Sequence, residues 1–286
     1  MHIMSKLILG DDEMEDFPLD ELPDAVIVVI LSFCSVEFLT KQACLVSKKW
    51  RDLIDSQTLW KLKCMQERVL VPQGLPMQYR DYRLLCLNNP FGRNLLRNWD
   101  ASDGFSFWRC YYNRKRRALH GATGIKVEES TWKESYGSEA LSELKIGTTR
   151  CWAASCVMVT LSQKVDLIDQ GVSAAVLDYI QPVIRVSVWT AARFDCASHY
   201  IIEVTLLGEN GQTLGDDLKF TKTRDVPQWG ESSWVKVSHS FRNYGKGVRT
   251  VKFVHGGTDR QFWAGNYGPK MAAPSVRLEI EGKLKN

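Results

Sequence analysis

The sequence predicts an α+β protein, with an all-helical N-terminal part and a C-terminal antiparallel β-sandwich of jelly-roll-like topology. Two observations carry this prediction. Apolar residues recur at helical spacing up to residue 60, whereas after residue 92 they alternate with a period of two and no long helical stretch appears. With 286 residues, of which 44% are hydrophobic, the chain is long enough to bury the cores of two domains.

Residues 1–18 are expected to be a flexible lead. Eight acidic side chains crowd residues 11–24, and such a run is usually solvated, although it could also dock on a basic partner or mimic a nucleic acid. The apolar patch at the N-terminus is followed at once by acids rather than by a small-residue cleavage site, so no secretory signal is expected. The longest apolar run, residues 25–34, is shorter than the roughly 20 residues that cross a bilayer. We therefore expect a cytoplasmic protein without a membrane span.

Residues 19–65 are predicted to form two or three short helices. Pro23 suits a first helical turn, and Ile27, Ile30 and Leu31 then recur at helical spacing. Residues 35–40 are interpreted as a polar break, after which the periodicity resumes. So few helices bury little apolar surface alone, which predicts a partner that completes them.

Residues 66–91 are predicted to be a linker with helices. Proline and glycine punctuate this segment, and residues 77–87 have the length and spacing of one spacer helix that would hold the two halves at a fixed angle.

Residues 92–286 are predicted to form the sandwich. Alternation between apolar and polar residues marks strands at 184–188, 200–206 and 276–280, and glycine-rich turns are expected at 208–217 and 243–247. Short strands separated by such turns favour two packed antiparallel sheets over an α/β fold.

The sequence lacks the common signatures of catalysis, cofactor binding and metal binding. No glycine-rich phosphate loop, G-x-S-x-G or H-E-x-x-H motif is present. His239 stands between Ser238 and Ser240, but neighbouring strand residues point to opposite faces and cannot act as a nucleophile and its base. Eight scattered cysteines without a C-x-x-C pair favour free thiols over zinc. The net charge of +4 is mild, and the basic cluster at 113–117 is expected to be a solvated loop rather than a nucleic-acid site.

Residues 19–61 resemble the F-box. The resemblance rests on Leu22-Pro23, on Ile30-Leu31 and Phe33, on Val46 with Lys49-Trp50-Arg51, and on Leu59-Trp60; Cys34-Ser35 stand where the family usually has a leucine and a proline. It implies binding to a Skp-type adaptor and, through it, to cullin and RING subunits that bring a ubiquitin-charged E2. The residues expected to serve the F-box fold and adaptor docking are Leu22, Pro23, Ile30, Leu31, Phe33 and Trp50.

The second half resembles the F-box-associated domain of the sugar-recognising F-box proteins and of the fish nonspecific cytotoxic cell receptor protein. The matching stretches include NPFGRNLLRN at 89–98, VDLIDQG at 165–171 and the QFWAGNYGPK segment at 261–270, and they follow in the order of the family over about two hundred residues. In glycan-binding members, loops at one end of the sandwich hold the chitobiose core of N-linked high-mannose glycans.

The family's glycan site can be carried onto this chain residue by residue. Its stacking aromatic pair falls on Phe262 and Trp263, and its aspartate on Asp195. The lysine position is Ala264 and the phenylalanine position is Cys156, so a charge-assisted donor and an aromatic wall are both replaced. Each such contact contributes about 1 to 3 kcal/mol, so the two replacements are expected to weaken sugar binding.

The sequence therefore predicts a non-catalytic substrate-recognition subunit of an SCF ubiquitin ligase, directed to N-glycosylated misfolded proteins. Two alternatives remain open: a sandwich that binds non-glycosylated protein targets, and a cell-surface receptor like the cytotoxic-cell relative. Phe262 and Trp263 also have a structural interpretation, in which they cap the sandwich while Gly265 and Gly268 permit tight turns.

Overall fold

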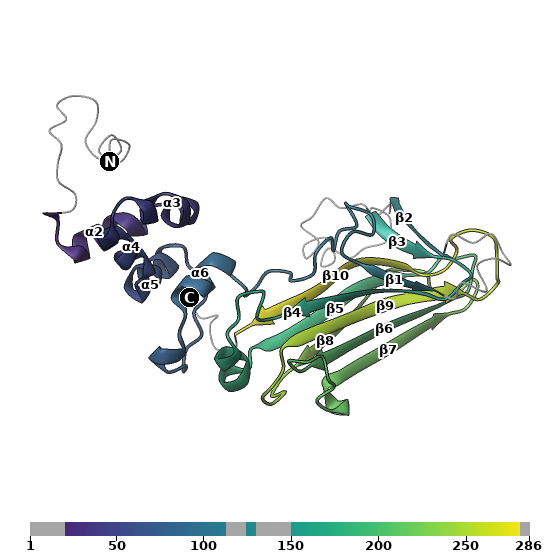
Figure 1. Cartoon of the computed structure of the whole chain (residues 1–286). Coiled ribbons are helices and arrows are strands. Elements are labelled where there is room, and N and C mark those ends of the chain that lie inside the picture. Colours follow the sequence, from purple (N-terminus) through teal and green to yellow (C-terminus); the bar gives the residue numbers. More distant parts are fainter. Residues whose placement is uncertain (1–20, 113–123, 130–149, 281–286) are drawn as a thin grey trace, which may run out of the picture. The chain divides into compact units, whose positions relative to one another are not determined.

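The computed structural model describes residues 21–112, 124–129 and 150–280, and these fall into two compact units, residues 1–89 and 90–286. The acidic lead at 1–18 and the basic cluster at 113–117 both lie outside the described residues. The first unit is helical and the second is built of strands (Figure 1), which confirms the predicted α+β fold class.

The helical unit contains more helices than the sequence predicted. The α-helices are α2 (Asp24–Ser32), α3 (Val36–Lys41), α4 (Lys48–Asp55), α5 (Gln57–Gln66) and α6 (Tyr82–Asn88), with 3-10 turns η2 (Ala43–Leu45) and η3 (Met77–Tyr79). The predicted polar break at 35–40 is wrong, because α3 occupies it. The Ser35 side chain caps α3 by accepting a hydrogen bond of 3.2 Å from the backbone N of Phe38, and Leu39 is fully buried.

The single spacer helix predicted for residues 77–87 is also wrong. Pro76 precedes the short η3 turn, Arg80 then adopts an extended conformation, and α6 begins anew after Asp81. The Asp81 carboxylate accepts a hydrogen bond of 2.9 Å from the backbone N of Leu84, so it caps a second helix rather than lying inside a continuous one.

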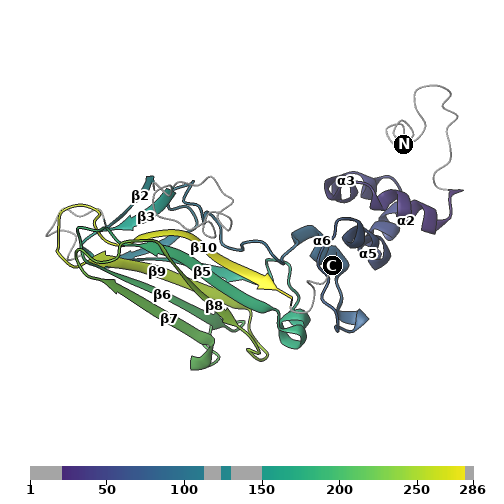
Figure 2. The same ribbon diagram turned by 180° about the vertical axis from the view of Figure 1, so that it is seen from behind.

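The second unit is a sandwich of two five-stranded antiparallel sheets. One sheet has the order β1-β4-β9-β6-β7 and the other β2-β3-β10-β5-β8, and Figure 2 shows them from behind. The strands are β1 (Arg109–Tyr112), β2 (Ile125–Glu129), β3 (Arg150–Ala154), β4 (Val159–Asp166), β5 (Val183–Ala191), β6 (Ser198–Leu207), β7 (Lys219–Val226), β8 (Val235–Phe241), β9 (Thr250–Asp259) and β10 (Lys270–Glu279). The three predicted strands fall on β5, β6 and β10, and the two predicted turns join β6 to β7 and β8 to β9.

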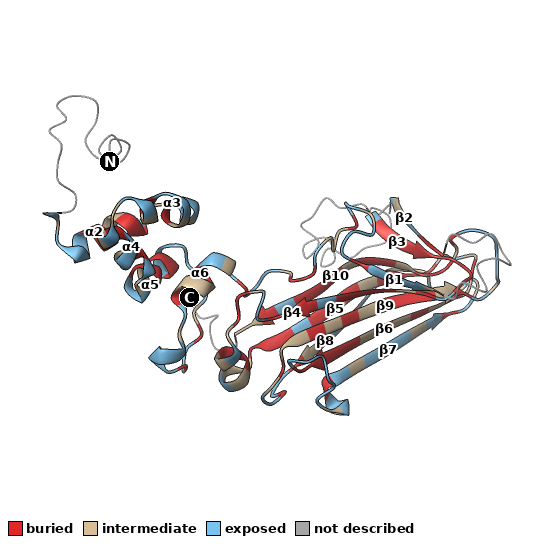
Figure 3. Ribbon diagram, in the orientation of Figure 1, coloured by how far each residue is buried: buried red, intermediate tan, exposed pale blue. Residues whose placement is uncertain are grey.

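Alternating side chains fill the space between the two sheets. Along β5, Ile184, Val186 and Val188 are fully buried while Arg185 between them is exposed. Along β6 and β9 of the other sheet, buried positions alternate with half-buried ones over much of each strand (Figure 3). Rings from opposite sheets meet in this core, for example Trp152 on β3 and His255 on β9, whose centroids lie 5.9 Å apart. No helix in the described part of the chain is long and apolar enough to cross a membrane.

Candidate functional site

Three loops between strands gather at one end of the sandwich. β9 ends at Asp259 opposite Ser198, the first residue of β6, and Ser198 also lies opposite Val226 at the end of β7. Ala191, the last residue of β5, pairs with Lys270 at the start of β10. The loops at 192–197, 227–234 and 260–269 therefore share this end, which we call the loop end.

Hydrogen bonds tie the loops of the loop end to one another. The side-chain oxygen of Gln261 accepts hydrogen bonds from the backbone N of Ala197 at 2.8 Å and from the Cys196 thiol at 3.2 Å. The Gln228 amide donates to the backbone oxygen of Asp195 at 2.9 Å. Hydrogen bonds between the loops therefore hold the backbone that carries these side chains in place.

Phe262 and Trp263 stand out from the loop between β9 and β10. Phe262 is 58% exposed and Trp263 37% exposed, and the Trp263 ring packs edge-on against Tyr267 with centroids 5.4 Å apart. Phe262 has φ of 58°, a left-handed conformation that non-glycine residues seldom adopt. Ala264 beside them is exposed and contributes no polar side-chain atom.

The buried carboxyl of Asp259 holds the Phe262 backbone in place. One of its oxygens accepts a hydrogen bond of 2.7 Å from the backbone N of Phe262, while the other has no hydrogen-bond partner among the described residues. Burial raises the pKa of Asp259, because a carboxylate loses its hydration there. A left-handed backbone at a non-glycine residue costs conformational free energy, and such strained residues cluster at binding surfaces.

Arg193 anchors the other side of the same loop. Its guanidinium makes two contacts to the Glu128 carboxylate, at 2.9 and 2.8 Å, donates to the backbone oxygen of Asn266 at 3.0 Å, and lies over the Tyr267 ring at 5.7 Å. Burial opposes ionisation of Glu128, but the charges of Arg193 and Lys270 outweigh it and hold the Glu128 pKa below its ordinary value. Tyr267, the edge partner of Trp263, is thereby fixed by a charged network.

A second exposed aromatic pair, Phe194 and Trp229, was not foreseen from the sequence. Phe194 is 58% and Trp229 61% exposed, their centroids lie 5.3 Å apart, and the backbone N of Trp229 donates to the backbone oxygen of Phe194 at 2.8 Å. Trp229 also has positive φ, 65°. The sequence did contain one indication of it. Trp229 lies in a Pro-Gln-Trp-Gly turn sequence between two strands, outside the strand positions that fill the core, so it could have been expected at the surface.

The structure brings some of the predicted glycan residues together and buries another. Asp195 is half-buried in the loop that carries Phe194, while Phe262, Trp263 and Ala264 are exposed on the 260–269 loop. Cys156 is only 3% exposed and packs with Val157. Burial raises the pKa of the Cys156 thiol, with a further contribution from the charge of Asp259. Cys156 therefore offers no surface to a ligand in this conformation.

The six residues predicted for the F-box divide between core and surface. Leu31 is fully buried and Trp50 is 4% exposed, so both belong to the helical core. Leu22 and Ile30 are partly exposed and Pro23 is exposed. Phe33 is 76% exposed, and the other exposed apolar side chains of the same unit include Val26, Val29, Leu45 and Val46. An exposed aromatic ring such as Phe33 is a usual anchor of a protein interface, and apolar side chains around such an anchor exclude water from it.

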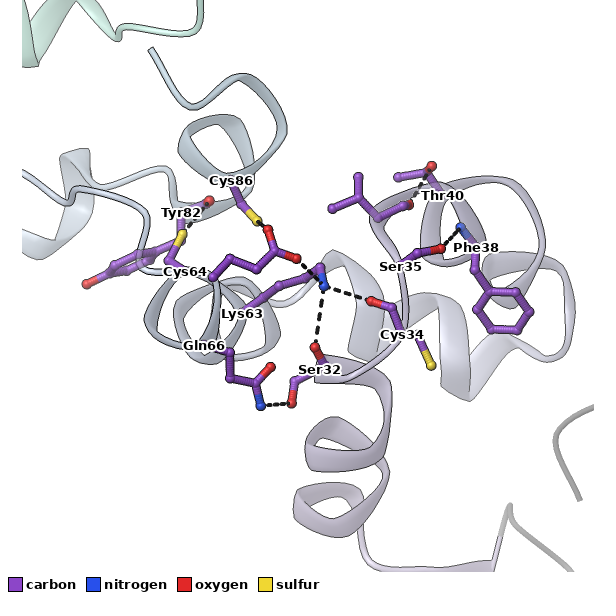
Figure 4. Close-up of polar contacts among 12 residues, drawn as sticks. Ser32, Cys34, Ser35, Phe38, Thr40, Lys63, Cys64, Gln66, Tyr82 and Cys86 are labelled. Atoms are coloured by element: carbon purple, nitrogen blue, oxygen red, sulfur yellow. Dashed lines mark hydrogen bonds and ion pairs between the residues drawn. The ribbon is translucent and has the colours of Figure 1, made fainter. Parts of the chain in front are cut away.

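Lys63 fixes the segment that presents Phe33. Its ammonium donates to the backbone oxygens of Cys34 at 2.7 Å and Ser32 at 3.4 Å and pairs with Glu67 at 2.7 Å (Figure 4). These oxygens lie at and just beyond the end of α2, where helical carbonyls lack an intrahelical donor. The Lys63 side chain is 3% exposed, so this cap is part of the core.

No catalytic or metal-binding arrangement emerges among the described residues. His239 stacks on Phe220 with centroids 4.4 Å apart and interplanar angle 5°, as an aromatic packing group between β8 and β7. No cluster of three or more His, Cys, Asp and Glu side chains in the described ranges could hold a metal ion.

Two family models match this chain. The F-box-like model matches residues 19–66 and the model of the F-box associated region matches residues 86–278. F-box only protein 6 of Homo sapiens is 31% identical over 262 residues, covering 90% of this chain and 83% of that protein. F-box only protein 44 of Homo sapiens is 32% identical over 262 residues, covering 91% of this chain and 96% of that protein. F-box only protein 2 of Bos taurus is 32% identical over 270 residues, covering 94% and 86%.

Solved structures with a similar arrangement have low sequence identity. The carbohydrate-binding domain TmCBM61, solved in complex with β-1,4-galactotriose, covers 66% of this chain and 100% of its own, with 18% identity and a TM-score of 0.38. A xylan-binding domain of Paenibacillus barcinonensis Xyn10C covers 67% and 97%, with 14% identity and a TM-score of 0.34.

Proposed function

Because this chain belongs to the family of F-box proteins with an F-box associated region, we propose that it recruits N-glycosylated misfolded proteins to an SCF ubiquitin ligase for degradation by the proteasome. The F-box, the associated region and the F-box only relatives support a role as substrate-recognition subunit. In this role the protein is a non-catalytic cytoplasmic receptor, and the ligase activity lies in other subunits.

The helical unit is proposed to dock on a Skp-type adaptor. The support comes from its exposed apolar side chains, with Phe33 as the most exposed large hydrophobic group of the described chain. Burying such a ring against a partner stabilises a complex by about 2 kcal/mol or more. The adaptor in turn connects the chain to the cullin and RING subunits.

The observation that carries the glycan part of the proposal is the exposed Phe262–Trp263 pair, in which the Asp259 carboxyl holds the backbone of Phe262 in a left-handed conformation. The C–H face of a pyranose ring can lie on an exposed indole, while the sugar's hydroxyl and N-acetyl groups need hydrogen-bond partners. Asp195 supplies an acceptor in the neighbouring loop. Ala264 supplies neither a charge nor a donor, so the affinity for a glycan is expected to be modest.

The test is calorimetric binding of a chitobiose-bearing high-mannose glycan to the full chain, with Trp263→Ala as the matched variant. Binding that disappears in Trp263→Ala supports the proposal. Ala264→Lys is expected to raise the affinity about tenfold, because it restores a charge-assisted donor beside the aromatic pair. A folded chain that binds no glycan, even as Ala264→Lys, would refute glycan recognition and leave the ligase role standing.

A second candidate function is recognition of non-glycosylated protein targets by the same loop end. The Phe194–Trp229 pair favours it, because exposed aromatic side chains are typical anchors for polypeptide. Free chitobiose separates the two candidates: it should displace targets that are held through sugar and leave protein-held targets bound.

A further inference from the structure

A cavity of about 430 Å³ lies on the outer face of the sheet β2-β3-β10-β5-β8, and its lining residues differ from those of the loop end. Its volume falls within the roughly 300 to 1,000 Å³ of ordinary small-molecule sites. Three outward side chains of β5 form its centre: Arg185, Ser187 and Trp189. We call this cavity the sheet-face trough.

The strand registers place matching side chains beside the β5 row. Ser275 of β10 lies opposite Ser187, and Arg277 lies opposite Arg185. On the other side, Lys236 of β8 lies opposite Trp189. Since residues two apart on a strand share a face, the trough has hydroxyl groups in the middle, guanidinium groups on one side, and an indole with an ammonium group on the other.

The segment before β1 closes the trough beyond β10. Asn94 donates to the backbone oxygen of Pro274 at 2.9 Å and accepts from the backbone N of Val276 at 3.1 Å, and Leu95 N donates to the backbone oxygen of Val276 at 2.8 Å. These bonds fasten the segment along the edge of β10. Trp99, which follows in the same segment, is half-buried and contributes a second indole to the lining.

The lining carries an excess of positive charge. Three cations, Arg185, Arg277 and Lys236, face one carboxylate, Glu279, which leaves a net charge of two. Arg185 and Glu279 neutralise each other through two contacts of 2.9 Å. Arg277 donates to the backbone oxygen of Gly92 at 2.8 Å through Nη1 and to the Ser275 hydroxyl at 3.2 Å through Nε. Its Nη2 has no hydrogen-bond partner among the described residues and can donate to an incoming anion.

We propose that the sheet-face trough binds a short saccharide that carries a carboxylate. Indoles match the C–H face of a sugar ring, serine hydroxyls match its hydroxyl groups, and a guanidinium matches a carboxylate. An acidic peptide would use the cations but would leave the two indoles without a matching ring. The proposal is independent of glycan recognition at the loop end, because the two sites share no residue.

The experiment is a calorimetric titration of the full chain with trigalacturonate, a chain of three uronic acids, followed in parallel by tryptophan fluorescence. One molecule is expected to bind per chain. Arg277→Gln and Trp189→Ala should each weaken binding about tenfold, whereas Lys222→Gln on β7, an equal loss of charge on the other sheet, should not change it. Galactotriose, which lacks the carboxylates, should bind at least tenfold more weakly than trigalacturonate.

Thermal melts identify any variant that fails to fold. If Trp189→Ala does not fold, Arg277→Gln still tests the proposal, because Arg277 is exposed and its replacement should not disturb the core. The proposal is overturned if trigalacturonate does not bind, or if it binds Arg277→Gln as tightly as the unchanged chain. Displacement by inorganic sulfate at equal concentration would show binding of a bare anion and overturn the saccharide assignment. Equal affinity for triglutamate, unaffected by Trp189→Ala, would assign the trough to acidic peptide instead.

Discussion

At the scale of single residues, the exposure of a side chain decides whether it can bind a partner or only support the fold. Leu31 and Phe33 are two positions apart on the same apolar stretch, yet Leu31 is fully buried and Phe33 is 76% exposed. Lys63 and His255 show the same effect for polar groups, since both are enclosed by the fold. Because each is buried, replacing Lys63 or protonating His255 should lower the free energy of unfolding.

Replacing Lys63 by methionine should destabilise the helical unit by about 2 kcal/mol. The change leaves the backbone oxygens of Ser32 and Cys34 without their buried donor and removes the partner of Glu67. Urea unfolding followed by circular dichroism at the helical band measures the loss. Lys41→Met is the matched control, because the Lys41–Glu37 pair is 69% and 73% exposed and contributes little. Equal unfolding midpoints for the two variants would contradict the capping role.

Stability should fall in acid because of His255. Both ring nitrogens are buried without a hydrogen-bond partner among the described residues, and burial lowers the His255 pKa from 6.5 to about 3. Below pH 6.5, the His255 imidazole therefore binds a proton in the unfolded chain but stays neutral in the folded chain. Above pH 6.5, His255 is neutral in both the folded and the unfolded chain and costs no stability. As the pH falls from 6.5 toward 3, the free energy of unfolding decreases by about 1.4 kcal/mol for each pH unit.

The check is to compare the unfolding free energy of the natural chain and of His255→Phe between pH 7 and pH 5. The phenylalanine variant should lose less stability over this range, because its ring packs among Trp108, Trp152 and Phe253 without titrating. Parallel curves for the two proteins would show that His255 is not the group responsible.

At the scale of elements, ion pairs and hydrogen bonds hold connecting segments to the sandwich. The short π-helical turn η5 (Val176–Ile180) carries Asp178, whose carboxylate makes two contacts to Arg249 at 2.8 and 2.9 Å and accepts from the backbone N of Gly247 at 2.8 Å. The hydrogen bonds from Arg249 hold the pKa of Asp178 below its ordinary value. This cluster connects the segment before β5 to the turn before β9.

Asp178→Asn should lower the unfolding free energy of the sandwich by about 1 to 3 kcal/mol. The Asp178 and Arg249 side chains are 19% and 15% exposed, so the lost charge-assisted bonds are poorly replaced by water. Tryptophan fluorescence in urea measures the change. Glu203→Gln serves as the comparison, because its pair with Lys219 is 31% and 45% exposed and should contribute under about 1 kcal/mol. An Asp178→Asn midpoint no lower than that of Glu203→Gln would refute the prediction.

At the scale of the whole molecule, the chain consists of two compact units that carry different candidate surfaces. The helical unit exposes Phe33 and its apolar neighbours, while the sandwich exposes Phe262 and Trp263 at the loop end. A receptor that brings a target to a ligase needs two such surfaces, because its contribution is to raise the effective concentration of the target near the ligase.

The two surfaces should therefore be separable by mutation. Phe33→Asp is expected to abolish co-purification of the Skp-type adaptor while glycan binding is retained, because a charge in an apolar interface is costly and the exposed site tolerates it in the free chain. Trp263→Ala is expected to do the reverse. Loss of both activities in either variant would contradict independent surfaces.

Leu31→Asp provides the contrast for this pair. Its side chain is fully buried, so the aspartate should unfold the helical unit rather than act at an interface. Circular dichroism distinguishes the two cases, since Phe33→Asp should keep the helical signal and Leu31→Asp should lose it. A folded Leu31→Asp chain that has lost adaptor binding would move Leu31 back to the docking surface.

The fold class follows from the amino-acid sequence alone, because the change of apolar period from helical to alternating after residue 92 reflects which faces must be buried. It also indicated β5, β6 and β10, whose alternation is regular. It did not locate α3 or the break between η3 and α6, since these depend on local caps at Ser35 and Asp81 rather than on periodicity.

Which candidate side chains are available to a ligand depends on tertiary packing. Sequence spacing cannot distinguish buried Leu31 and Cys156 from exposed Phe33 and Trp263, because all four are apolar and exposure depends on neighbours far along the chain. The same holds for the Phe194–Trp229 pair and for the sheet-face trough, whose residues come from segments almost two hundred positions apart. Strand pairing brings them together, and that pairing is a property of the fold rather than of any one segment.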